Sequence, residues 1–165
     1  MWLMIAPEIN NALNKWATMV VAQAKSNLLR GKKDATRTLS NSITYQIVPD
    51  QTSDIGADVE FSYADYGEYV ESGRRKGARM PPPSKLINWI KVKPIPRFRD
   101  KKGRFISYES QAFLIARSIG KKGIKPFPFM TNAVEQAQID LLYMLEEAIA
   151  EVFTQDIVAL EQLRG

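Results

Sequence analysis

The chain of 165 residues contains no cysteine and no histidine. Without thiols and imidazoles it cannot form disulfides, a Cys/His zinc site, or the Ser-His-Asp and Cys-His arrangements of many hydrolases. It also lacks the run of about 18 apolar residues that a membrane-spanning helix needs, so we expect no membrane partner. A metal ion can bind only through oxygen ligands, which suit magnesium or calcium. These absences favour a protein that is not an enzyme and uses no cofactor.

Charged residues are abundant but unevenly distributed. Lys and Arg total 23 against 18 Asp and Glu, for a net charge of +5. Residues 1–72 carry 6 basic and 9 acidic side chains, residues 73–125 carry 16 and 2, and residues 126–165 carry 1 and 7. A basic middle between acidic ends can bind nucleic acid, an acidic partner protein or the acidic ends of this same chain. It can also be a solvated basic loop region.

A long helix is predicted near each end of the chain. Apolar residues recur every three or four positions from Ile9 to Leu28, and Pro7 and Gly31 suit the two ends of a helix over residues 7–30. A second helix is predicted from about Thr131 onward. Its apolar residues exceed what one buried stripe needs, which suggests that it contacts a second chain as well as its own core.

Shorter elements are predicted between these helices. Alternation predicts two strands, at residues 43–47 and 55–62, that form a hairpin with a turn at 49–53. Residues 63–73 are interpreted as a turn followed by a third strand. Short helices are predicted after Ser84 and from Ser107 to Gly120, with a basic hairpin tip over residues 98–105 and Gly103 at its turn.

These elements predict an α+β fold in a single domain, residues 1–165. The long N-terminal and C-terminal helices pack on a small, mainly antiparallel sheet, and a basic hairpin or loop insertion occupies about residues 74–106.

The sequence contains only weak motifs for a catalytic, nucleotide-binding or metal-binding site. The Gly-Lys neighbourhoods at residues 31, 73 and 120 lack the spacing of a nucleotide-binding loop. The carboxylates of Asp65, Glu68 and Glu71 can in principle form an acid/base pair or a divalent-ion site. Pairing with the arginines at 74, 75 and 79 is the simpler interpretation. We assign no catalytic, cofactor-binding or metal-binding residue.

The basic and aromatic residues from Trp89 to Phe105 have two interpretations. Arginines can contact phosphates while Phe98 or Phe105 stacks on bases, but the segment matches no helix-turn-helix or zinc-finger signature. Arginine and aromatic side chains are also enriched at protein interfaces, and we favour a protein interface as the interpretation of this segment. The predicted interface residues are Arg74, Arg75, Arg79, Trp89, Arg97, Phe98, Arg99, Arg104, Phe105, Phe127, Phe129 and Phe153.

Three segments, taken in order, carry a family resemblance. They are YADYGEYVESG (residues 63–73), MPPP (80–83) before the Trp-containing stretch 85–91, and FLIARSIGKKGIKPFPF (113–129) before the last helix. Over about residues 43–153 the chain resembles the small neck proteins of tailed bacteriophages, of the tail-completion or head–tail joining type.

The resemblance implies a structural virion protein without catalysis. Copies of it form a homo-oligomeric ring around the DNA channel and join the portal or adaptor to the tail, after assembly in the host cytoplasm. DNA passes through without sequence-specific binding. We expect the basic middle to face protein, and neutralising Arg97, Arg99 and Arg104 to impair assembly while leaving the fold intact. The alternative is a DNA-binding accessory protein that uses residues 74–125.

Overall fold

A computed structural model describes residues 6–34, 36–49, 56–92 and 95–163. The chain forms two compact units, each built from segments that are distant in sequence. The first contains Met1–Asn27, Ile43–Tyr63 and Met130–Gly165, and the second contains Leu28–Ser42 and Ala64–Phe129. The prediction of a single domain with an insertion stays a prediction.

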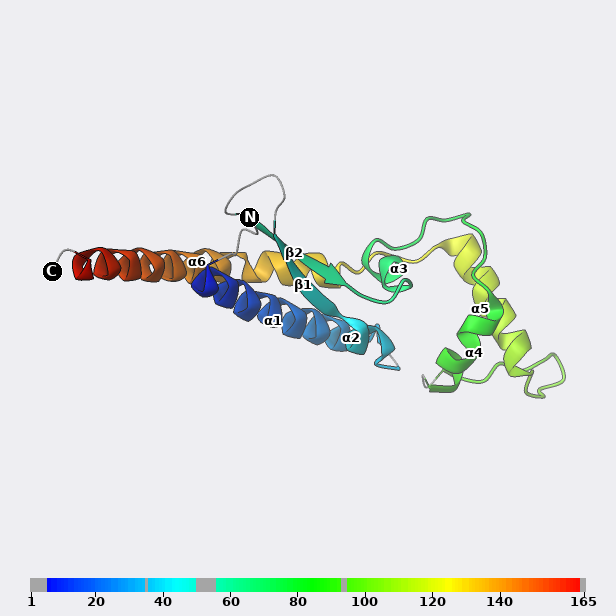
Figure 1. Cartoon of the computed structure of the whole chain (residues 1–165). Coiled ribbons are helices and arrows are strands. Elements are labelled where there is room, and N and C mark those ends of the chain that lie inside the picture. The colour runs from blue at the N-terminus through cyan, green and yellow to red at the C-terminus, as the bar shows by residue number, and fades with distance from the viewer. Residues whose placement is uncertain (1–5, 35, 50–55, 93–94, 164–165) are drawn as a thin grey trace. The chain divides into compact units, whose positions relative to one another are not determined.

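The first unit confirms the predicted α+β fold. The long helices α1 (Pro7–Arg30) and α6 (Phe129–Gln162) pack on an antiparallel sheet of β1 (Thr44–Pro49) and β2 (Ala57–Ser62), as Figure 1 shows. The strands pair in register from Thr44 with Ser62 to Pro49 with Ala57. Most of the predicted turn at 49–53 lies outside the described residues.

Trp16 connects the two long helices and the sheet. Ala17 and Ala24 of α1 and Ala133 of α6 are fully buried. The indole N–H of Trp16 donates a hydrogen bond to the carbonyl oxygen of Ala137 at 2.8 Å. The Trp16 ring also meets Phe61 of β2 edge-on, with centroids 5.9 Å apart, so one side chain joins both helices and the sheet.

The described residues of the second unit form four helices: α2 (Thr38–Ser42), α3 (Gly67–Glu71), α4 (Pro83–Val92) and α5 (Tyr108–Lys122). Helices α4 and α5 pack against each other. Asp34, which precedes α2, stabilises the start of that helix. Its carboxylate accepts the backbone N–H groups of Leu39 and Ser40 at 3.3 and 2.8 Å. This caps the first turn of α2.

The predicted third strand at residues 63–73 is wrong. The segment forms the short helix α3, whose following residue Ser72 donates its backbone N–H to the Glu68 carbonyl at 2.9 Å. Gly73 then takes a φ of 74°, and Arg74 forms an isolated antiparallel bridge with Ile124. A strand needs a neighbouring strand to pair with, and among the described residues the only bridge at this end of the segment joins Arg74 to Ile124.

The predicted end of α5 at Gly120 is also wrong, by two residues. Ser107 caps the helix as predicted, since its hydroxyl accepts the Ser110 N–H at 3.1 Å. The helix continues to Lys122 and ends at Gly123, which has a φ of 75° and donates its N–H to the Ile119 carbonyl. Gly120 lies within the helix, and a Cβ there would be 3.3 Å from both the Ala78 carbonyl oxygen and the Met80 Cα.

Candidate protein interface

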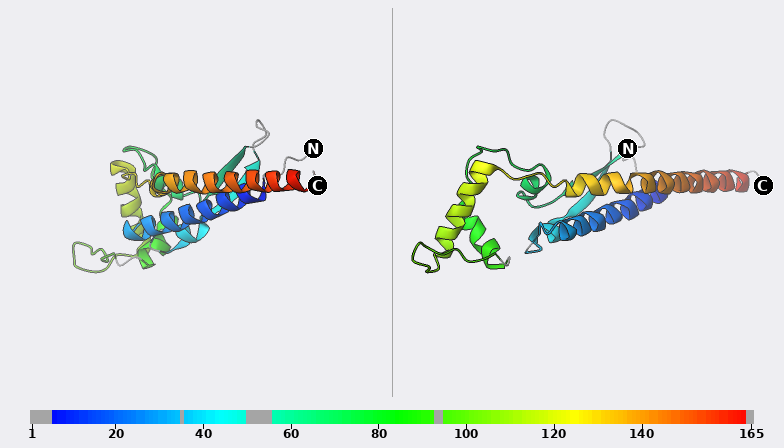
Figure 2. Two further views of the ribbon diagram at one scale, coloured as in Figure 1. Left: turned by 90° about the vertical axis from the view of Figure 1, so that its left-hand side faces the viewer. Right: turned by 180° about the vertical axis from the view of Figure 1, so that it is seen from behind.

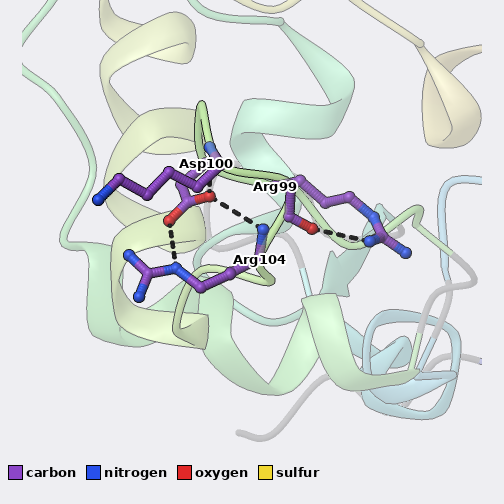
Figure 3. Close-up of polar contacts among 5 residues, drawn as sticks. Arg99, Asp100 and Arg104 are labelled. Atoms are coloured by element: carbon purple, nitrogen blue, oxygen red, sulfur yellow. Dashed lines mark hydrogen bonds and ion pairs between the residues drawn. The ribbon is translucent and has the colours of Figure 1, made fainter.

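The basic hairpin lies between α4 and α5 in sequence, and its turn is held by one carboxylate (Figure 3). Asp100 accepts the backbone N–H groups of Lys102 and Arg104 at 2.8 and 2.9 Å and the Arg104 Nε at 3.0 Å. The N–H of Arg104 is the largest of the contacts that lower the pKa of Asp100, followed by the Arg104 side chain and the N–H of Lys102. Gly103 has a φ of 78°, so the predicted turn is confirmed.

The two other arginines of the hairpin contact the hairpin itself. Arg99 donates to the Gly103 carbonyl at 2.8 Å and lies 4.1 Å from the centroid of the Phe105 ring. Arg97 donates to the Ile106 carbonyl and lies 4.0 Å from the centroid of the Tyr108 ring. Its Nε is buried without a hydrogen-bond partner in the part of the chain that the structure describes. These guanidinium groups therefore hold the hairpin together through hydrogen bonds and cation–π contacts.

A buried glutamine fixes the base of the hairpin. Gln111 of α5 is completely buried, donates its Nε2 to the Pro96 carbonyl at 3.2 Å and accepts the Phe98 N–H at 3.3 Å. Gln111 was not among the residues predicted from the sequence. The signal was a polar residue next to Ala112, which together with Ala116 marks the buried side of the helix.

The remaining predicted interface residues in the second unit occupy different environments. Arg74 donates to the Arg79 carbonyl and lies 4.9 Å from the Tyr69 ring centroid, while Arg75 and Arg79 are exposed. Trp89 is half-buried in α4. Phe127 is half-buried over Gly31, with the Lys33 ammonium 5.6 Å from its ring. Phe129 is completely buried, so it contributes to packing and presents nothing to a partner in this conformation.

Helix α6 has a second apolar face. Ala133, Ala137 and Ala148 mark its buried face. Two positions on from Ala137, a rotation of about 200° brings Ile139 to the opposite side. Six large apolar side chains on that side are each 57–67% exposed: Ile139, Leu142, Tyr143, Phe153, Ile157 and Leu160. We call these six residues the α6 stripe, and it includes the predicted interface residue Phe153.

The end of α6 stands beyond α1 in every view of the first unit (Figures 1 and 2). From Ile149 to Leu163 every residue except Val152 is exposed. An isolated helical segment of about 15 residues is marginal in water. A segment that the described residues leave exposed and that is rich in large apolar side chains therefore favours a protein partner over solvent.

The acidic segment around α3 was the candidate for a divalent-ion site in the sequence. Glu68 accepts a hydrogen bond from the Ser72 hydroxyl at 2.5 Å, within α3 and its cap. Among the described residues no group of three or more Asp or Glu side chains could hold a metal ion. In the same residues no helix is long and apolar enough to cross a membrane.

Comparison with known proteins identifies no relative, because no family model, curated protein or solved structure matches the chain. The function is therefore argued from two features of the chain itself: the basic hairpin, which its own contacts hold, and the acidic helix α6 with its exposed apolar stripe.

Proposed function

We propose that the protein is a non-enzymatic structural component of a tailed-phage virion, forming a homo-oligomeric ring at the head–tail junction that joins the portal or adaptor to the tail. The single observation that carries the proposal is the α6 stripe, because an exposed row of large apolar residues opposite an already packed face indicates protein contact. The resemblance of residues 63–73, 80–91 and 113–129 to phage neck proteins supplies the class of assembly.

The charge distribution supports a ring. Subunits of a ring contact through two different patches, and each copy must carry both. In this chain the basic residues concentrate at 73–125, in the second unit, whereas α6 in the first unit carries seven acidic side chains and no basic one. Opposite charges on two patches of one subunit favour head-to-tail contact between copies and disfavour contact of like patches.

The experiment is deletion of the gene from a phage that carries it. We expect DNA-filled heads and complete tails that remain separate, visible by negative-stain electron microscopy. Expression of the intact chain in trans restores joined particles, in which mass spectrometry detects the protein. Normal joined particles from the deletion phage would refute the proposed role.

A direct DNA-binding role predicts a different result. Purified protein would bind duplex DNA with an affinity that falls steeply with salt, because lysines and arginines release counterions from phosphates. Gel shifts at 50 and 200 mM salt measure this. We expect little binding at either concentration.

A further inference from the structure

The α6 stripe needs a partner that is both apolar and basic. The stripe lies on a helix whose charged residues are all acidic: Glu135, Asp140, Glu146, Glu147, Glu151, Asp156 and Glu161. Glu146 lies on the same side as the stripe, between Tyr143 and Phe153, by helical rotation. Pairing of α6 with a second α6 would bring these carboxylates together, which is unfavourable.

Helix α5 presents a surface with the required composition. Phe113 and Leu114 are 47% and 44% exposed, although Ala112 and Ala116 beside them are completely buried. Arg117 and Lys121 are also exposed, and all four side chains fall within about 100° of rotation on one side of the helix. We call these four residues the α5 face. None of them was among the interface residues predicted from the sequence.

We propose that the α6 stripe of one copy docks on the α5 face of a second copy, in a head-to-tail contact between subunits. The inference rests on the proposed ring and names the two surfaces that form it. Apolar residues match apolar residues, and Arg117 and Lys121 match the carboxylates of α6. The stripe covers 22 positions, about 32 Å, and α5 is about 22 Å long, so α5 can lie along about two thirds of the stripe. Exposed Phe105, just before α5, offers a further apolar contact.

The absence of cysteine allows a direct test with the full chain. Two single-cysteine variants, Phe153→Cys and Leu114→Cys, are mixed and oxidised, and non-reducing gels report the dimers. We expect a mixed dimer of Phe153→Cys with Leu114→Cys. The matched control is Gln155→Cys, which is exposed two positions from Phe153 and about 200° around the helix, and we expect it to form at least fivefold less mixed dimer.

Charge reversal provides the second arm. Arg117→Glu with Lys121→Glu is expected to weaken self-association about tenfold in sedimentation velocity, because it places acidic residues against acidic residues. Glu146→Lys in the other copy should restore part of that loss. Lys85→Glu, which reverses an exposed cation on α4, is the control and should leave association unchanged.

Each alternative gives a distinct result. A predominant Phe153→Cys homodimer would overturn the proposal in favour of α6–α6 pairing. A variant that carries both cysteines in one chain tests contact within a single copy. If it forms an internal disulfide whose yield does not depend on protein concentration, the α5 face of the same copy covers the stripe. A monomer at 100 µM without cross-links would also overturn it. The purified protein could associate through this contact even if deletion of its gene leaves phage heads and tails joined. That result would uphold the contact between copies and refute the neck role.

Discussion

Replacement of Gly123 by alanine should destabilise the second unit far more than replacement of Gly77 or Gly103, which have a similar φ. Arg74 and Ile124 form a bridge with two backbone hydrogen bonds, at 2.9 and 2.8 Å. A Cβ on Gly123 would collide with the Arg74 carbonyl and lie 2.9 Å from the Lys76 nitrogen. The bridge therefore has no room for a side chain at this position.

The magnitude follows from two contributions. An L-residue at a left-handed φ costs about 1–2 kcal/mol. The collision displaces the bridge, whose two hydrogen bonds contribute about 1 kcal/mol each. We therefore expect Gly123→Ala to lower the free energy of unfolding by about 3–4 kcal/mol. Gly77 and Gly103 have φ values of 81° and 78° with nothing within 4 Å of a Cβ, so alanine there should cost only about 1–2 kcal/mol.

The assay is urea unfolding of the full chain followed by far-UV circular dichroism. Hydrogen exchange at the Arg74 and Ile124 amides localises the effect, because loss of the bridge should speed exchange at both positions. If Gly123→Ala and Gly77→Ala destabilise the protein equally, the collision contributes nothing and the bridge is not a tight contact.

Three further predictions concern single contacts. Trp16→Phe removes the hydrogen bond to Ala137 and part of a buried ring, and should cost about 2 kcal/mol in urea unfolding; an unchanged midpoint would show that the bond between α1 and α6 contributes nothing. Ser107→Ala should cost about 1 kcal/mol through loss of the α5 cap, whereas Ser110→Ala keeps the capping hydroxyl and should be nearly neutral by the same measurement. Because the folded protein lowers the pKa of Asp100, the hairpin turn should be fully formed above the ordinary aspartate pKa of about 4 and loosen as pH falls through the lower folded value. NMR shifts of the Lys102 and Arg104 amides should report this step, and Asp100→Asn should abolish it.

The long elements could be predicted because local signals agree with tertiary packing. Pro7 and Gly31 bracket α1, whose observed limits are Pro7–Arg30. Alternation over β1 and β2 reflects one side facing the helices, and the Ser107 cap depends only on residues three positions apart. In each case the determining contact is short in sequence or repeats many times.

Helix α2, which was not predicted, and segment 63–73, which was predicted as a strand, depend on contacts that sequence periodicity does not show. The α2 cap requires Asp34 to reach residues 39 and 40 around a bend, where Arg37 takes a φ of 57°. Whether residues 63–73 form a strand depends on a neighbouring strand to pair with, and the bridging residue at Ile124 is 50 positions from Arg74. Such long-range pairing leaves no periodic signal.

The structure also changes what the arginine-rich segment implies about an interface. A list of arginines predicts positive charge available to a partner, but Arg97, Arg99 and Arg104 each bond to an oxygen atom of the hairpin itself. Neutralising all three would therefore disturb the hairpin as well as any contact, so an assembly defect would not locate the interface. Arg117 and Lys121 lie exposed on a helix whose buried residues hold it in place without them. Charge reversal on the α5 face therefore separates binding from folding, which reversal in the hairpin cannot do.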